Sequence, residues 1–249
     1  MNIFIVGISG KMGKAVCEKA NSYGCTVVGG LDKIPLGNFP TFESADKVNV
    51  PIDVIIDFSR PETLPQVITL ADKFHCPCVM ATTGYSQAQE EQIAKLSTRV
   101  AVFKSANMSV GVNVISKLLQ TAAQLLEGYD IELIERHHNQ KADAPSGTAK
   151  LLCKSLEKGL SYSPAYRYGR DENSGKREKG DIGVHAVRGG TVVGEHEIAF
   201  YGSDETVTIS HTALSRSVFA DGALRAALFL NGKKSGLFDM SDMLREGEK

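Results

Sequence analysis

One stretch of the sequence, residues 135–149, gathers several side chains that could move protons. His137 and His138 are adjacent, and Lys141 follows three residues later. Imidazole titrates near neutral pH, and an ammonium group can donate a proton or attract a carboxylate. Taken singly, a histidine at the end of a strand is more often a surface or interface residue. The group as a whole predicts acid–base chemistry on an anionic substrate.

The same stretch ends in Ser146, Gly147 and Thr148, just before a predicted helix. Hydroxyl groups and the free N–H groups of a helix start form a ready site for an anion. A serine or threonine in this position is more commonly only a helix cap. Adjacent residues of a strand point to opposite faces, so His137 and His138 are poorly placed to share a metal ion. No metal site is therefore expected.

A glycine-rich turn near the start of the chain has the position of a nucleotide site. Gly7, Gly10 and Gly13 lie between an apolar segment and an amphipathic one. The spacing is G-x-x-G-x-x-G, not the strict G-x-G-x-x-G, and it stands at the first strand-to-helix junction. Backbone and helix N–H groups hold a pyrophosphate at such a junction. We expect a dinucleotide there, against the alternative of a purely structural turn.

Asp32 ends the second predicted strand, 19 residues after Gly13. An acidic residue at about 20 residues from the turn accepts hydrogen bonds from the adenosine ribose and favours NADH. Lys33 follows directly. Its cation either offsets the repulsion of a 2′-phosphate, which would admit NADPH, or is an ordinary surface charge. The sequence therefore predicts NADH and/or NADPH as cofactor and leaves the choice between them open.

The elements that must position these residues begin with an alternation of short apolar strands and helices up to about residue 108. This alternation predicts an α/β fold with a Rossmann-like parallel sheet covered on both faces. Ligands bind at the carboxyl ends of such strands, where Ala81–Gly84 and Ser105–Met108 are expected. The predicted strands are 3–6, 26–31, 52–58, 79–82 and 100–103, and the predicted helices are 11–22, 61–74 and 86–96.

Beyond residue 108 the pattern changes to that of an α+β domain. Within the segment 129–136, Ile131 and Leu133 are expected on one face, against Glu132 and Glu135 on the other. Such alternation predicts a sheet with one wet or interface face. Residues 161–179, rich in Arg, Lys, Gly and Ser, are expected to form a loop or flap. The other predicted elements are helices 110–126, 148–158 and 216–230 and strands 182–188, 194–201 and 206–211.

The composition argues against several classes of protein. The chain has 249 residues, with 28 Lys and Arg against 29 Asp and Glu, so its formal charge is −1. Such a protein lacks a basic field for nucleic acid or an anionic membrane surface. No apolar run reaches the roughly 18 residues of a membrane helix. The segment Met1–Gly7 is too short and uncharged for a signal peptide and is expected to be a buried strand.

The five cysteines point to a reducing compartment. Their number is odd and none forms a C-x-x-C pair, which argues against both zinc and a disulfide framework. Cys76 and Cys78, separated by one proline, are either redox-active or, more commonly, small core residues. Reduced thiols indicate a cytoplasmic protein.

The stretch 135–149 resembles the signature of the dihydrodipicolinate reductase (4-hydroxy-tetrahydrodipicolinate reductase) family of the diaminopimelate and lysine pathway. The order His-His, Lys and Ala-Pro-Ser-Gly-Thr-Ala is highly specific, whereas the glycine motif alone is not. The resemblance covers essentially the whole chain. Further similar blocks are residues 7–13, 57–62, 81–84, 105–113, 188–190, 194–196 and 210–213.

The resemblance implies a Rossmann-like domain over residues 1–107 and about 215–249, and a substrate-binding and tetramerisation domain over 108–214. It implies NAD(P)H-dependent reduction of the cyclic dicarboxylate 4-hydroxy-tetrahydrodipicolinate to tetrahydrodipicolinate with loss of water. His137 would be the acid–base residue and Lys141 the proton donor. The substrate would be held by His138, Ser146, Gly147 and Thr148. The cofactor would be held by Gly7, Ile8, Ser9, Gly10, Lys11, Met12, Asp32, Lys33, Phe58, Ala81, Thr82, Thr83, Ser105, Ala106, Asn107 and Met108.

Two departures from the family pattern are visible. Ala81 stands where the family commonly has Gly, and its methyl group should be tolerated if the backbone φ is negative. Asn139 and Gln140 stand where relatives often carry more basic residues, which lowers the positive field near the substrate. One alternative is another dehydrogenase of this layout, acting on an amino or semialdehyde acid. The other is a dinucleotide-sensing protein, which the presence of both His137 and Lys141 disfavours.

Overall fold

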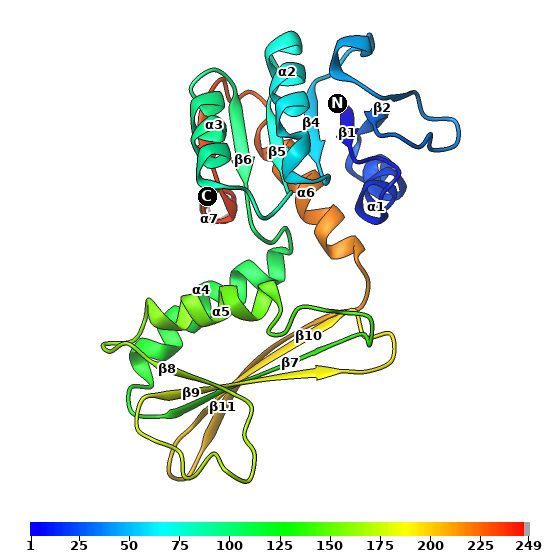
Figure 1. The fold of residues 1–249 in the computed structure, drawn as a ribbon. Helices are drawn as coiled ribbons and strands as arrows, with labels where there is room; N and C mark the ends of the chain where they lie inside the picture. Colours follow the sequence, from blue (N-terminus) through cyan, green and yellow to red (C-terminus); the bar gives the residue numbers. More distant parts are fainter. Residues whose placement is uncertain (247–249) are drawn as a thin grey trace. The chain divides into compact units, whose positions relative to one another are not determined.

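The computed structural model describes residues 1–246 and divides the chain into two compact units. Unit 1 consists of Met1–Val110 together with the chain from Arg216 onward, and unit 2 is the intervening segment Gly111–Ser215. Figure 1 shows the helices and strands of each unit. No helix within residues 1–246 is both long enough and apolar enough to span a membrane.

Unit 1 is built on a seven-stranded sheet in the order β12-β6-β5-β4-β1-β2-β3, with every neighbouring pair parallel. The predicted α/β class with a Rossmann-like parallel sheet is confirmed. Parallel strands have their carboxyl ends at one edge, so the loops after β1, β4, β5 and β6 share that edge. The strands are β1 Asn2–Val6, β2 Thr26–Leu31, β3 Thr41–Phe42, β4 Val54–Asp57, β5 Cys78–Met80, β6 Ala101–Lys104 and β12 Gly236–Phe238.

Helices cover both faces of this sheet, because alternate residues of each strand are apolar on both sides (Figure 1). Ile3 and Ile5 of β1 pack in one cluster with α1, α6 and α7, whereas Phe4 and Val6 pack in the other with α2 and α3. The helices are α1 Lys11–Lys19, α2 Leu64–Phe74, α3 Gln87–Ser97, α6 Ser217–Phe229 and α7 Met240–Glu246, with short 3₁₀ turns at Ala20–Tyr23, Ala45–Lys47 and Pro61–Thr63.

Unit 2 is a five-stranded sheet in the order β11-β10-β7-β9-β8 with two helices on one face. β10 runs antiparallel to β7 and β11, while β9 runs parallel to β7 and β8. Apolar residues of the sheet pack against both helices in a third core cluster. The elements are α4 Val110–Leu125, β7 Asp130–His137, α5 Gly147–Glu157, β8 Ala165–Tyr168, β9 Asp181–Arg188, β10 Gly194–Tyr201 and β11 Thr206–Ala213.

The position expected for Glu135 in β7 is wrong. Glu135 is expected on the wet face with Glu132, but it lies an even number of residues from Ile131 and Leu133 and shares their face. Its side chain is fully buried, as is most of His137 two residues on. A strand alternates with a period of two, so only Glu132 of the two glutamates reaches the outer face.

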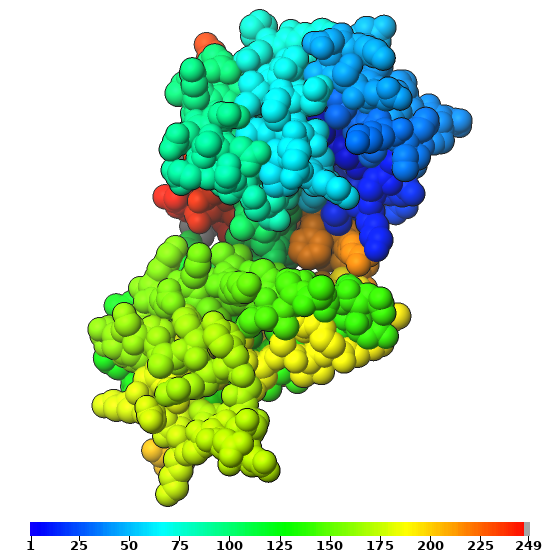
Figure 2. All heavy atoms as spheres, viewed as in Figure 1, coloured from blue at the N-terminus to red at the C-terminus, as the bar shows by residue number. Residues whose placement is uncertain are grey.

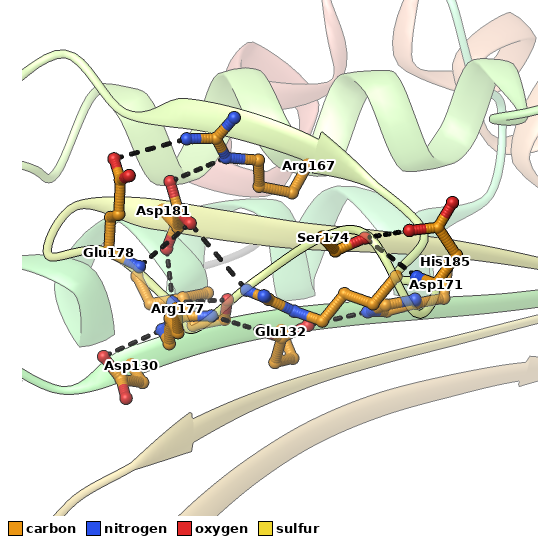
Figure 3. Close-up of polar contacts among 11 residues, drawn as sticks. Asp130, Glu132, Arg167, Asp171, Ser174, Arg177, Glu178, Asp181 and His185 are labelled. Atoms are coloured by element: carbon orange, nitrogen blue, oxygen red, sulfur yellow. Dashed lines mark hydrogen bonds and ion pairs between the residues drawn. The ribbon is translucent and has the colours of Figure 1, made fainter.

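The segment expected as a loop or flap over 161–179 contains the edge strand β8. Its side chains lie mostly on the surface of unit 2 (Figure 2). Ion pairs tie it to the sheet (Figure 3): Arg167 contacts Asp181 at 3.0 Å, and Arg177 contacts Asp130 at 2.9 Å and also Glu132. The segment is therefore held by charged contacts where apolar ones are scarce.

The cysteines of the structure are all free. Cys76 and Cys78 are buried, and burial raises the pKa of the Cys76 thiol to about 12. The pKa of Cys78 is raised well above its ordinary value, again by burial. A thiol that stays protonated is a poor nucleophile, so the structure favours the interpretation of these two residues as core residues.

Candidate active site

The glycine-rich turn of unit 1 brings backbone segments into close contact. Gly7 has a φ of +84°, and a Cβ atom there would lie 2.8 Å from the carbonyl oxygen of Phe58. A Cβ atom on Gly13 would lie 2.3 Å from the carbonyl oxygen of Gly7. Only glycine fits either position. The first N–H groups of α1 consequently stand beside a turn whose glycine positions carry no side chain, which fits a pyrophosphate.

Asp32 is held directly beside this turn. Its carboxylate accepts hydrogen bonds from the backbone N–H of Ser9 at 3.0 Å and from that of Lys33 at 2.8 Å. Oδ1 also accepts from the N–H of Ile34 at 3.5 Å, whereas Oδ2 accepts from Ser9 and has a second lone pair for a ribose hydroxyl. The Lys33 side chain is exposed next to it. The placement fits the adenosine end of a dinucleotide.

The remaining predicted cofactor residues follow β4, β5 and β6 at the same edge of the sheet. Thr82 accepts a hydrogen bond from the backbone N–H of Ser59 at 3.0 Å, which joins two of these loops. The Ala81 N–H donates to the carbonyl of Asp57 at 2.9 Å. Within residues 1–246 the one non-glycine residue with a positive φ is His75, so Ala81 meets the condition under which its methyl group is tolerated.

The last two predicted cofactor residues, Asn107 and Met108, are also buried. The Met108 side chain is 3 % exposed and belongs to the unit 1 core, so it offers a cofactor its backbone only. Asn107 is 9 % exposed, and its side-chain oxygen accepts from the N–H of Ser109 at 2.9 Å. Its neighbour Ser105 donates its hydroxyl to the Asn107 carbonyl at 2.8 Å. This loop is held by its own polar groups.

A buried carboxylate, Glu135, stands at the centre of the polar cluster in unit 2. Its Oε2 atom lies 2.6 Å from Nδ1 of His137, and its Oε1 atom accepts from the backbone N–H of Ser146 at 3.0 Å. Arg188 of β9 donates to both oxygens, at 2.7 and 2.8 Å. The sequence reasoning did not assign Glu135 or Arg188 to the site. Glu135 is spaced by two residues from Leu133 and from His137, which places all three on one face of β7. This spacing is a signal in the sequence for Glu135.

The charges in this cluster follow from these contacts. Burial alone would raise the pKa of Glu135, but the hydrogen bonds from Arg188, His137 and the Ser146 N–H outweigh it and lower that pKa. Burial lowers the pKa of His137, and the hydrogen bond to Glu135 opposes this only in part. Glu135 is therefore ionised, and His137 is mainly neutral at physiological pH.

Ser146 caps α5 and also contacts a histidine from β10. Its Oγ atom accepts from the N–H of Ala149 at 3.1 Å and lies 3.2 Å from Nε2 of His196. The ring of His196 packs edge-on against that of His137, with centroids 5.2 Å apart. Burial lowers the pKa of His196 to about 4, so this ring is neutral. The cap interpretation of Ser146 holds, and its hydroxyl also belongs to the cluster.

Lys141 lies in the loop between β7 and α5. Its ammonium group forms an ion pair with Asp143 at 2.8 Å, and its backbone N–H donates to the carbonyl of His138 at 3.1 Å. Its charge is close enough to lower the pKa of both His137 and His196. The structure thus gathers His137, Ser146 and Lys141 in unit 2, together with Gly147 and Thr148 in the first turn of α5.

Comparison with known proteins identifies the family of the chain. Residues 1–108 match the family model described as dihydrodipicolinate reductase, N-terminus, and residues 111–244 match the model of its C-terminus. The chain is 44 % identical to the 4-hydroxy-tetrahydrodipicolinate reductase of Clostridium novyi (strain NT), covering 98 % of both chains. It is 45 % identical to the enzyme of the same name from Caldanaerobacter subterraneus subsp. tengcongensis, covering 99 % of both.

A solved structure shares the fold of the whole chain. The dipicolinate-bound dihydrodipicolinate reductase from Paenisporosarcina sp. TG-14 superimposes with a TM-score of 0.79 at 23 % identity, covering 96 % of this chain and 97 % of that one. The two family models together match residues 1–108 and 111–244, and the relatives are matched over nearly their full length. The chain belongs to the dihydrodipicolinate reductase family.

Proposed function

We propose that this protein reduces 4-hydroxy-tetrahydrodipicolinate to tetrahydrodipicolinate with NADH or NADPH and releases water. The observation that carries the proposal is the cluster in which an acid–base histidine, His137, shares one carboxylate with the start of α5. A neutral imidazole can exchange a proton, and the helix N-terminus beside it can bind an anion. Membership of the reductase family makes this reaction the expected one over that of another dehydrogenase or a sensing protein.

The cofactor belongs at the carboxyl edge of the unit 1 sheet. The turn from Gly7 to Met12 would hold the pyrophosphate, and Asp32 would accept hydrogen bonds from the adenosine ribose. Phe58, residues 81–83 and residues 105–108 would line the rest of the site. When bound, NAD(P)H supplies the hydride, and the protein orients it. Lys33 is the group that would admit a 2′-phosphate beside the Asp32 carboxylate.

The substrate belongs at the start of α5 in unit 2. Dipicolinate, which the Paenisporosarcina enzyme binds, is a planar dicarboxylate. The N–H groups of Gly147 and Thr148 and the hydroxyl group of Ser146 would bind one carboxylate of such a ring. His138 and Lys141 would contribute to the other, because both lie in the loop that leads into the helix.

Two side chains would move protons. Nε2 of His137 is the free edge of a ring whose other nitrogen contacts Glu135, so it can accept or return a proton at the substrate. Hydride addition to a conjugated imine leaves electron density on the ring that must be protonated. Lys141, charged in its ion pair with Asp143, would donate that proton. Each such group contributes about 10²- to 10⁴-fold in rate.

The assembly and location are part of the proposal. The outer face of the unit 2 sheet carries exposed apolar residues, Val187 and Tyr201, among charged ones, which supports its use as an interface between copies of the chain. We propose a homotetramer formed through this face. Five free cysteines support a cytoplasmic enzyme.

A coupled assay tests the function. The cyclic substrate is generated from pyruvate and aspartate semialdehyde by its synthase, and the absorbance of NADH and NADPH is followed separately after this protein is added. Oxidation that depends on both the synthase and this protein is expected. Folded protein that binds NADH and yet oxidises neither cofactor would contradict the proposal. The ratio of the two rates decides the cofactor preference.

A further inference from the structure

We infer that Glu135 is a positioning residue for the reaction, whose single carboxylate fixes both the ring of His137 and the first turn of α5. The inference rests on the proposed function, because it assigns His137 the proton and α5 the substrate. It adds a residue that touches neither substrate nor cofactor. The residue acts through the two elements that it joins.

The Glu135 carboxylate forms a bridge between His137 and Ser146. Each of these two residues contacts a different oxygen of the carboxylate. Oε2 faces Nδ1 of His137 at 2.6 Å, and Oε1 faces the N–H of Ser146 at 3.0 Å. His137 ends β7, whereas Ser146 is the N-cap residue of α5. One rigid group therefore sets the distance between a proton-transfer residue and an anion-binding helix start. A small change in this distance would reduce the rate of the reaction strongly.

The bridge also selects one tautomer of His137. The Glu135 side chain is fully buried and ionised by its paired hydrogen bonds with Arg188, so it only accepts hydrogen bonds. Nδ1 of the neutral ring must then carry the hydrogen, and Nε2 must carry the lone pair. A carboxylate that orients a catalytic imidazole in this way is the arrangement of an acid–base dyad.

Arg188 extends the same network to a third element. One of its terminal nitrogens donates to Glu135 Oε1 at 2.8 Å and to the carbonyl oxygen of Asp143 at 2.6 Å. Asp143 is the ion-pair partner of Lys141. The Glu135–Arg188 pair therefore fixes the loop that carries the proton donor as well. A buried carboxylate needs such a partner, because an unpaired one would be strongly destabilising.

The charged and titratable groups that face His137 come from each element packed around it. Glu135 lies two residues before it on β7, and Lys141 lies in the loop that follows. Arg188 belongs to β9 and His196 belongs to β10. The two cations and burial disfavour the imidazolium, and Glu135 is the group that favours it. Removal of the Glu135 charge must therefore lower the pKa of His137.

The test is the variant Glu135→Gln, which keeps the shape and removes the charge. We expect kcat to fall by about 10²-fold, in the range of a lost acid–base or orienting group, with the KM for NADH unchanged. The limb of the pH–rate profile that reports His137 should move to lower pH. In ¹⁵N NMR spectra of the wild-type protein, Nδ1 of His137 should carry the hydrogen at a pH above its pKa, and in Glu135→Gln this tautomer should lose its dominance.

A matched control lies three residues away on the same strand. Glu132 also pairs with an arginine and a histidine, Arg177 and His185, but on the outer face of the sheet (Figure 3). Its Oε2 atom lies 2.7 Å from Nε2 of His185. Glu132→Gln removes a charge that is paired in a similar way but is 19 % exposed, and it should leave both the pH profile and the tautomer of His137 unchanged.

Each outcome decides the inference. A wild-type ring protonated at Nε2 would overturn it, and this measurement needs no variant that might fail to fold. A Glu135→Gln enzyme with the wild-type pH profile and tautomer would overturn it as well. If the wild-type protein is inactive in the coupled assay, the proposed function fails. The NMR measurement then still decides whether Glu135 sets the ring of His137.

Discussion

The backbone of Gly194 faces His137 so closely that a Cβ atom on Gly194 would lie 3.0 Å from Nε2 of that ring. Nε2 is the edge of His137 turned away from Glu135. The absence of a side chain at Gly194 therefore leaves this nitrogen accessible.

Gly194→Ala should reduce activity, because the added methyl group crowds Nε2 while Glu135 prevents the ring from moving away. We expect kcat to fall by about tenfold or more and stability to fall by about 1 kcal/mol, as for a small overpacking change. The measurement is steady-state kinetics with thermal unfolding. Gly189→Ala is the control, since a Cβ atom at Gly189 would meet nothing within 4 Å. Equal kinetics for the two variants would contradict the prediction.

Lys141→Ala should remove the proton donor and leave the cofactor site intact. We expect turnover to fall by about 10²-fold or more, while NADH binding, followed by cofactor fluorescence, keeps its Kd. Asp143→Asn removes the ion-pair partner at 2.8 Å and should affect turnover less than Lys141→Ala. Unchanged turnover in Lys141→Ala would remove this residue from the mechanism.

Asp32→Ala should weaken NADH more than NADPH. The carboxylate accepts from the N–H groups of Ser9 and Lys33, so some loss for both cofactors is expected from a looser turn. The additional loss for NADH should reach about tenfold in KM, the value of a lost hydrogen bond to a charged group. Lys33→Ala is the complementary variant and should weaken NADPH selectively. Equal effects of Asp32→Ala on the two cofactors would disprove the ribose assignment.

Asp57, buried at the end of β4, should make stability depend on pH. Burial raises its pKa above the ordinary value of 3.8, although hydrogen bonds from Ser59, Thr82 and Tyr85 oppose this. Above pH 3.8 the unfolded chain loses this proton first, so the folded state binds more protons. The free energy of unfolding of the wild type, relative to Asp57→Asn, should therefore fall as pH rises from 3.8 to the raised pKa of Asp57 in the folded state.

Urea titrations of both proteins at several pH values measure this difference. Tyr85→Phe is a useful companion, because it removes one hydrogen bond to Asp57, of 3.0 Å, and should cost about 1 kcal/mol. A difference between wild type and Asp57→Asn that rises with pH would contradict the assigned direction of the pKa.

Much of the fold follows from local patterns that the sequence displays. The apolar segments 3–6 and 26–31 and the helix starting at Pro61 lie within a few residues of β1, β2 and α2 with its preceding 3₁₀ turn. β3, β8 and β12 were missed because each is a short strand at the edge of its sheet and contains no buried residue. β5 is equally short, but it is central and all three of its residues are buried, so it appears as an apolar run.

The site was predictable only where its residues are neighbours in the chain. The run from His137 to Thr148 shows its chemistry directly. Arg188 reaches Glu135 across 53 residues, and His196 reaches Ser146 across 50, because sheet pairing brings β9 and β10 beside β7. Pairing between distant strands is not encoded in any local pattern. The charge of Glu135 predicts an outer position, whereas its spacing of four residues from Ile131 indicates the buried face on which the structure places it.

The interrupted course of the chain through unit 1 has a consequence for synthesis. Unit 2 is continuous from Gly111 to Ser215, whereas the unit 1 core needs Ala223 and Leu224 of α6 and Met240 of α7. A nascent polypeptide that has reached Ser215 carries six strands of the first sheet, with one apolar face covered by α1 but not yet by α6 and α7. The ribosome therefore releases the part of the enzyme that it makes first in a form that is completed last, and premature termination after unit 2 must leave an aggregation-prone product.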